Sequence, residues 1–186
     1  MFTRLPRSLG FALFFLLFVA PLPGWTQSSA DLPGSTTEAA TSGDLAEGKR
    51  LYRINCAGCH KWHGGGGGGY GGDALSLRKT KFDRAQIIET VSCGRPGTGM
   101  PYHRRDAYQD GACYGLHEGD VVGNGMVLAA NNFLRPQEIG AIADYVIADI
   151  KGHGEPNYQE CLAFFGTGSR VCDIYAPGGG EQKAAP

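Results

Sequence analysis

Cys56, Cys59 and His60 form a C-x-x-C-H motif, which carries the most specific chemistry in the sequence. Two thiols three residues apart at a helix end can each form a thioether with a vinyl group of haem, and the adjacent histidine can then bind the iron. The motif predicts one covalently bound haem c, attached through both cysteines, with His60 as an axial iron ligand.

Two other interpretations of the same cysteines are a zinc site and a thioredoxin-type redox pair. A structural zinc site needs a second Cys/His pair at matching spacing, which the sequence lacks. A thioredoxin-type pair follows a strand in an α/β pattern, and that pattern is also missing. Haem attachment is therefore the favoured interpretation.

The iron needs a sixth ligand or keeps an open site. Beyond the N-terminal region the sequence has two methionines, Met100 and Met126. Met100 lies in GRPGTGMP (94–101), where prolines stiffen the chain and glycines permit a close approach to a haem face. We expect Met100 to be the ligand. The alternatives are Met126, an open site, or one of the histidines His63, His103, His117 and His153.

Residues 1–30 have the features of an export signal. Arg4 and Arg7 provide a basic start, an apolar run follows over 9–20, and small residues permit cleavage after Ala30. The apolar run is shorter than the about 20 residues that span a bilayer comfortably. An uncleaved membrane anchor is the alternative.

The 186-residue chain is expected to hold one structured domain, residues 44–175. Residues 31–43 contain almost no large apolar side chains and form an expected flexible leader, and 176–186 form an expected disordered tail. The formal net charge of −1 argues against a nucleic-acid binder that works by neutralising phosphates.

Four further cysteines should be oxidised in an exported chain. They allow three pairings, of which we expect the two local ones, Cys93–Cys113 and Cys161–Cys172. The first pair brackets Met100. Each bridge would stabilise the fold by about 2–4 kcal/mol, because it restricts the unfolded chain. A catalytic thiol is disfavoured, since no basic partner at a helix start is evident.

The elements that must position these residues are helical. Capping patterns and apolar periodicity predict helices over 44–55, from 83 to Gly94, from Pro136 to Gly152, and over 157–165. No convincing run of alternating strand residues occurs, so the fold class is all-α. The long segments 61–80 and 95–133 lack a helical period and are expected to be loops that bind or wrap something.

Three segments resemble class I c-type cytochromes, of the mono-haem exported bacterial type. They are LAEGKRLYRINCAGCH (45–60), GRPGTGMP (94–101) and EIGAIADYV around Tyr145. The resemblance implies a cytochrome c-like helical domain around one haem, with thioethers to Cys56 and Cys59 and iron ligation by His60 and Met100. It also implies that the first and last family helices cross.

In that crossing, Gly48 and Tyr52 should lie against Ile142 and Tyr145. The physical properties agree, because a glycine lets helix axes approach and the tyrosines offer large apolar contacts. The family often has Gly-Pro-x-Leu behind the axial histidine, whereas this chain has Gly-Asp-Ala-Leu at 72–75.

Three other features depart from the family. The glycine run 64–69 is interpreted as a flexible surface loop, with a close approach to haem or to a partner as the alternative. Residues 102–133 form an insertion, and residues 153–175 add a short C-terminal helical element.

The leading functional hypothesis is a periplasmic electron carrier, because a haem with both axial positions filled suits outer-sphere electron transfer. Its expected donor is an exported dehydrogenase, with a PQQ-dependent enzyme suggested by the resemblance, and its acceptor an oxidase or another cytochrome. Alternatives are a haem subunit of a larger respiratory or dehydrogenase complex, and a haem enzyme or gas-binding protein with an open iron site. An electron carrier has no catalytic residues of its own.

Docking charges are ambiguous in the sequence. Six basic residues are candidates for a docking surface: Lys79, Lys81, Arg84, Arg95, Arg104 and Arg105. They either form a local basic rim around the Met100 loop or belong to an ordinary solvated surface, and the sequence supports both interpretations equally.

Overall fold

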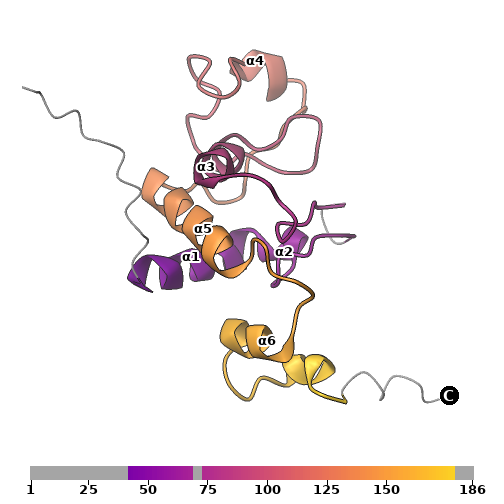
Figure 1. Ribbon diagram of the computed structural model, residues 1–186. Coiled ribbons are helices and arrows are strands. Elements are labelled where there is room, and N and C mark those ends of the chain that lie inside the picture. The colour runs from indigo at the N-terminus through magenta and orange to yellow at the C-terminus, as the bar shows by residue number, and fades with distance from the viewer. Residues whose placement is uncertain (1–41, 69–72, 179–186) are drawn as a thin grey trace, which may run out of the picture. The chain divides into compact units, whose positions relative to one another are not determined.

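The computed structural model describes residues 42–68 and 73–178 (Figure 1). The expected signal (1–30), nearly all of the leader, Gly69 and most of the tail lie outside these ranges. Among the described residues, none of the helices is both long and apolar enough to span a membrane. The described residues form helices and isolated bridges but no strand, and the all-α class is confirmed.

Helices α1 (Ser42–Asn55) and α5 (Pro136–Asp149) pack against each other and form the centre of the fold (Figure 1). A Cβ placed on Gly48 would overlap with the backbone carbonyl of Ala141 and with Cβ of Tyr145. Next to this contact, the rings of Tyr52 and Tyr145 lie 5.4 Å apart, centroid to centroid. The crossing implied by the family resemblance is therefore present, with Ala141 rather than Ile142 closest to the glycine.

The start of α1 differs from the sequence prediction. The capping pattern placed the helix start at Asp44, but α1 begins at Ser42 and Asp44 lies in its first turn. An acidic residue is favourable there because it opposes the positive end of the helix dipole. Glu47, also near the start of α1, pairs with Arg50 at 2.6 Å.

Helix α3 (Arg84–Cys93) begins and ends as predicted. The Asp83 carboxylate accepts a hydrogen bond from the Gln86 amide, and the Gln86 side chain accepts one from the Asp83 amide, so the capping box is complete. Gly94, at φ 66°, ends the helix. Ile87 and Val91 are buried from α3 in the core shared with α5.

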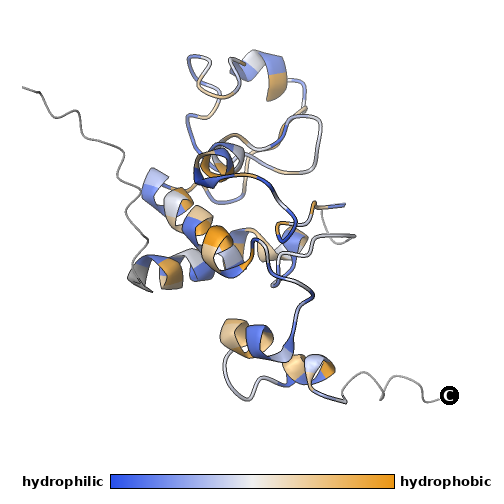
Figure 2. Ribbon diagram, viewed as in Figure 1, coloured by the Kyte–Doolittle hydropathy of each residue, from blue (hydrophilic) through white to orange (hydrophobic). Residues whose placement is uncertain are grey.

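Helix α5 begins at Pro136 as predicted and ends three residues before Gly152. Ile150 caps it, and Gly152 turns the chain at φ 81°. Figure 2 shows the strongest apolar colour of α5 toward its C-terminal half. The main core combines this face with α1, α3 and α6 and contains Leu51, Tyr52, Ile87, Val91, Leu134, Ile139, Ile142, Ala143, Tyr145, Val146, Ile150 and Phe164.

The C-terminal helix α6 (Tyr158–Phe165) also follows the prediction, with Asn157 as its N-cap and Gly166 after its last residue. Three short elements were not predicted, because four to six residues are too few to show a period. They are α2 (Ala57–His60), α4 (Glu118–Val121) and the 3-10 helix η1 (Arg170–Tyr175).

A second, smaller core lies within the insertion. Its buried members come from the end of α3 and from the following loop: Cys93, Ala107, Tyr108, Cys113, Val121 and Val127. We call residues 102–133 the insertion lobe. This segment, expected to be a long loop that binds or wraps something, therefore has a small hydrophobic core of its own.

Replacing Gly48 by alanine should destabilise the holoprotein by about 1–3 kcal/mol, because the new methyl group must push α1 away from α5. The loss should appear in urea unfolding followed by circular dichroism. Gly119→Ala is the matched control, since a Cβ at Gly119 meets nothing within 4 Å. Equal stability of the two variants would contradict the close helix contact.

Candidate functional site

The C-x-x-C-H motif folds as a single turn directly after α1. Cys56 links α1 to α2, its amide donates to the Tyr52 carbonyl (2.9 Å), and the His60 amide donates to the Cys56 carbonyl (2.9 Å). Tyr52, fully buried in the helix crossing, donates from its hydroxyl to the Lys61 carbonyl (2.8 Å). The core therefore holds both ends of the motif, and Cys56, Cys59 and His60 share one short stretch of helix.

The imidazole of His60 is oriented by a backbone carbonyl. Its Nδ1 lies 3.0 Å from the carbonyl oxygen of Leu75. A histidine that donates from Nδ1 leaves Nε2 available as a metal ligand, and such a partner fixes the tautomer and the ring orientation. Desolvation lowers the pKa of His60, and the positive charge of Arg95 lowers it further. Both effects favour the neutral imidazole, which is the form that binds metal.

The role of Leu75 was missed by sequence reasoning. The segment 72–75 attracted attention only because it lacks the proline usual in the family. A backbone carbonyl serves this role regardless of its side chain, so residue type gives no signal for it.

The thiols of Cys56 and Cys59 are the two that remain outside disulfides among the described residues. Desolvation, together with the neighbouring Cys59, raises the pKa of Cys56 to about 12. A nucleophilic or redox-active thiol needs a lowered pKa instead. The environment therefore does not support the thioredoxin-type interpretation.

Met100 lies on the edge of the main core. Its side chain is half-buried and packs against the same cluster as Cys56 and Ala57. Arg95, from the same loop, is close enough to His60 to act on its pKa. The structure thus places the loop 94–101 and the C-x-x-C-H turn against the same core cluster.

The other candidate ligands have different surroundings. His63 accepts a hydrogen bond from the Gly65 amide, and His153 contacts the Glu160 carboxylate (3.3 Å). His103 is buried with Nδ1 directed at the Asn132 carbonyl (3.4 Å). His117 is exposed at the start of α4, and Met126 is 46% exposed.

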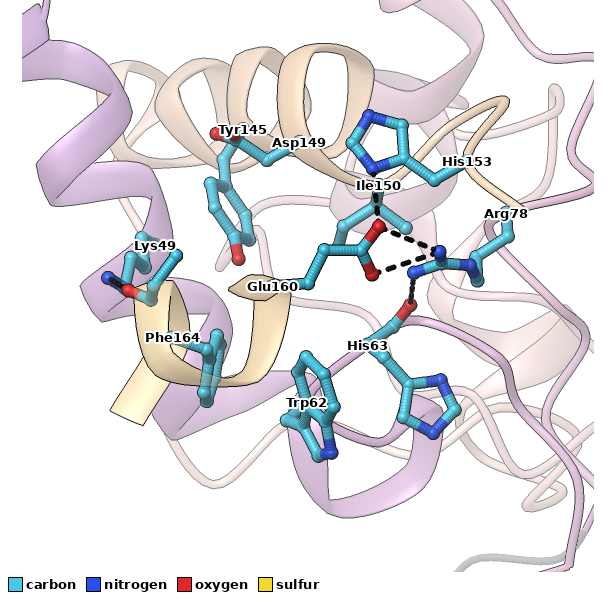
Figure 3. A pocket seen from close by; sticks show the side chains of 11 residues that line it. Lys49, Trp62, His63, Arg78, Tyr145, Asp149, Ile150, His153, Glu160 and Phe164 are labelled. Carbon is cyan, nitrogen blue, oxygen red and sulfur yellow. Dashed lines mark hydrogen bonds and ion pairs between the residues drawn. The ribbon is translucent and has the colours of Figure 1, made fainter. Parts of the chain in front are cut away.

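A cavity of about 130 Å³ lies next to α6 (Figure 3). The residues that line it do not include the predicted haem ligands and attachment sites Cys56, Cys59, His60 and Met100. Arg78 is buried beside the cavity and donates to both Glu160 carboxylate oxygens (3.2 and 3.0 Å), to the His63 carbonyl (3.1 Å) and to the Gly154 carbonyl (2.5 Å). Figure 3 shows the Glu160 carboxylate between Arg78 and His153. The guanidinium therefore ties α6 to the loop that follows His60.

Arg78 is a second residue that sequence reasoning missed. An arginine is rarely buried unless it is paired, and its partner Glu160 lies 82 residues away in the sequence. No local pattern could have indicated this contact.

Both expected cysteine pairs are joined in the structure. Cys93 and Cys113 have Cα atoms 5.5 Å apart, and Cys161 and Cys172 have Cα atoms 5.6 Å apart, which suit a disulfide. The first bridge connects the end of α3 to the insertion lobe, and the second connects α6 to η1.

The proposed basic rim is partly neutralised by internal pairs. Arg84 binds Asp144 (2.6 Å), and Arg104 lies 2.8 Å from Asp106. Arg105 lies over the ring of Phe133, and Lys79 and Lys81 are exposed. For Arg84 and Arg104, these ion pairs favour an ordinary solvated surface over a basic docking rim.

The donor set fits a covalent haem better than a bare metal ion. It offers two thiols on one turn, an oriented neutral imidazole and a half-buried thioether that packs against the same core cluster. Within residues 42–68 and 73–178, no three His, Cys, Asp or Glu side chains gather in a way that could hold a metal ion.

Comparison with protein families gives one match. The family model described as cytochrome C oxidase, cbb3-type, subunit III matches residues 43–115, fewer than half of the chain. The match includes the C-x-x-C-H turn and the Met100 loop and ends inside the insertion lobe. Searches of curated proteins and of solved structures found no match.

Acidified acetone should leave the haem on the purified holoprotein, because thioether bonds to Cys56 and Cys59 survive this treatment. A variant with both cysteines changed to serine should release any bound haem into the solvent. The pigment in each phase can be measured by absorbance. Complete extraction from the wild type would contradict covalent attachment.

Peptide mapping without reduction should find the links Cys93–Cys113 and Cys161–Cys172. The Cα separations suit both bridges without backbone movement. A reduced and alkylated sample serves as the control. A link from Cys93 to Cys161 or Cys172, or four alkylated thiols without reduction, would overturn this pairing.

Proposed function

Because residues 43–115 are a c-type cytochrome domain, which carries covalently bound haem c and transfers electrons between redox proteins, we propose that this chain is a periplasmic mono-haem electron carrier. Cys56 and Cys59 would hold the haem by thioethers, and His60 and Met100 would supply the ligands of its iron. When bound, the haem supplies a one-electron centre. The chain supplies the ligands, their orientation and the surrounding apolar packing.

One observation carries this proposal. The Met100 side chain packs against the same core cluster as Cys56, while His60 is held with its Nε2 available by the Leu75 carbonyl. A thioether ligand raises the reduction potential of a haem, and two protein ligands leave no open position for a substrate. This combination suits electron transfer rather than catalysis at the iron.

The proposed location rests on the export-signal pattern, and the proposed partners rest on the family resemblance. Cytochrome c domains of the matched type are generally exported, and residues 1–30 have an export-signal pattern. An exported dehydrogenase, such as a PQQ-dependent enzyme, is the proposed donor, and an oxidase or another cytochrome is the acceptor. Cleavage after Ala30 releases the carrier, whereas an uncleaved signal tethers it to the membrane.

A second candidate function is a haem subunit of a respiratory complex. It is favoured by the description of the matched family, which is an oxidase subunit. Cell fractionation followed by size-exclusion chromatography separates the two functions. The carrier should elute alone from the soluble periplasmic fraction, whereas a subunit should elute with other chains after detergent extraction of membranes.

The ferrous wild-type holoprotein should not bind carbon monoxide, because Met100 occupies the sixth position of the iron. Met100→Ala should bind it with a clear shift of the Soret band. The same variant should lose the weak far-red absorption band that a methionine sulfur–iron bond gives in the ferric state. Both effects are read by absorption spectroscopy.

Met126→Ala is the matched control and should behave like the wild type, since Met126 is the second candidate methionine and is exposed. Ready binding of carbon monoxide by the wild type would instead support a gas-binding protein or an enzyme with an open iron site. Loss of the far-red band in Met126→Ala would transfer the ligand role to that residue.

A further inference from the structure

The loop that presents Met100 is stiffened by Pro96 and Pro101, but its three glycines make it costly to order. It contains Gly94 and Gly97 at positive φ and turns back on itself through hydrogen bonds from the Arg95 amide to the Met100 carbonyl (3.2 Å) and from the Thr98 amide to the Arg95 carbonyl (3.0 Å). Glycine-rich segments lose the most conformational entropy on ordering. A single thioether ligand on such a loop therefore needs support from outside the loop.

The insertion lobe contacts the start of this loop through two tyrosine hydroxyls. Tyr108 donates to the carbonyl of Cys93 (2.5 Å), and Tyr114 donates to the carbonyl of Gly94 (3.0 Å). These are carbonyls at the C-terminal end of α3, which have no partner within the helix. Cys93 and Gly94 are both buried, so these carbonyls depend on the two tyrosine hydroxyls rather than on water.

Both tyrosines are fixed within the lobe. Tyr108 is 4% exposed, and its ring packs edge-on against Tyr102 with centroids 5.4 Å apart. Tyr114 directly follows Cys113 of the disulfide and adopts φ 57°, a left-handed conformation that non-glycine residues rarely take. The disulfide and the strained residue together aim the Tyr114 hydroxyl at Gly94.

The lobe also bonds to the middle of the Met100 loop, and a bond within the lobe holds the residue that follows the loop. The Gly97 amide donates to the Met126 carbonyl (2.8 Å), and the Tyr102 amide donates to the Leu128 carbonyl (3.0 Å). A Cβ on Gly94 would overlap with backbone atoms of Met100 and Tyr102. The two ends of the loop are therefore in close backbone contact, and the lobe binds the middle of the loop.

We propose that the insertion lobe is a brace that positions the Met100 sulfur, with Tyr108 and Tyr114 as positioning residues and the Cys93–Cys113 bridge as their common anchor. This inference rests on the proposed role of Met100 as an iron ligand. The lobe has its own core, separate from the main core of α1, α3 and α5. Loosening the brace therefore weakens the iron–sulfur bond more than it weakens the fold.

The test is a titration of the ferric holoprotein with imidazole, which competes with Met100 for the iron. Tyr114→Phe and Tyr108→Phe each remove one hydroxyl and should raise the apparent imidazole affinity about fivefold, the effect of one lost hydrogen bond. Cys93→Ser/Cys113→Ser should raise it at least as much. A variant that loses the far-red band before imidazole is added, because a residue such as His103 replaces the sulfur, supports the brace equally.

Two controls match these variants chemically. Cys161→Ser/Cys172→Ser removes the other disulfide, and Tyr175→Phe removes a hydroxyl for which no hydrogen bond occurs within the described part of the chain. Both should keep the wild-type imidazole affinity. Urea unfolding of every variant records the stability of the fold separately.

The proposal is wrong if the lobe variants keep wild-type imidazole affinity while only their urea midpoints fall. The lobe would then stabilise the fold without positioning the Met100 sulfur. The proposal is also wrong if both controls change the affinity as much as the lobe variants do. Failure of the proposed function looks different. In that case the wild type itself binds carbon monoxide, and Met100→Ala has the same imidazole affinity as the wild type.

Discussion

The contact between α1 and α5 at Gly48 is the constraint on which the arrangement of the site depends. Without a side chain at this position, the two helices approach until backbone meets backbone, and Tyr52 and Tyr145 pack beside the contact. Because the C-x-x-C-H turn follows α1 directly, the crossing also fixes where the two thiols and His60 lie. Tyr52 strengthens this link, since its hydroxyl binds the carbonyl just beyond His60.

The sequence allowed the main helices to be predicted, because capping and apolar periodicity depend on local chemistry. Asp83 and Gln86 form the expected capping box, and Asn157 caps α6. The start of α1 was misplaced because an acidic residue is favourable both as a cap and in the first turn, so Asp44 fits either position.

Features that depend on distant partners could not be predicted. The carbonyl of Leu75 behind His60, the pairing of Arg78 with Glu160 and the interior of the insertion lobe all join residues that no short pattern connects. Tyr108 and Tyr114 illustrate the limit well. In the sequence they are two of eight tyrosines, and only the folded lobe directs their hydroxyls at the end of α3.

The surroundings of Trp62 give the molecule a built-in optical reporter. The chain has two tryptophans, of which Trp25 belongs to the expected signal, so a chain cleaved after Ala30 keeps Trp62 alone. Trp62 lies two residues after His60, and its indole contacts the rings of Phe164 and Phe165 in α6 and of Tyr175 in η1. Haem quenches nearby indole fluorescence by energy transfer. Emission at this single position therefore follows both the presence of haem and the docking of the C-terminal element.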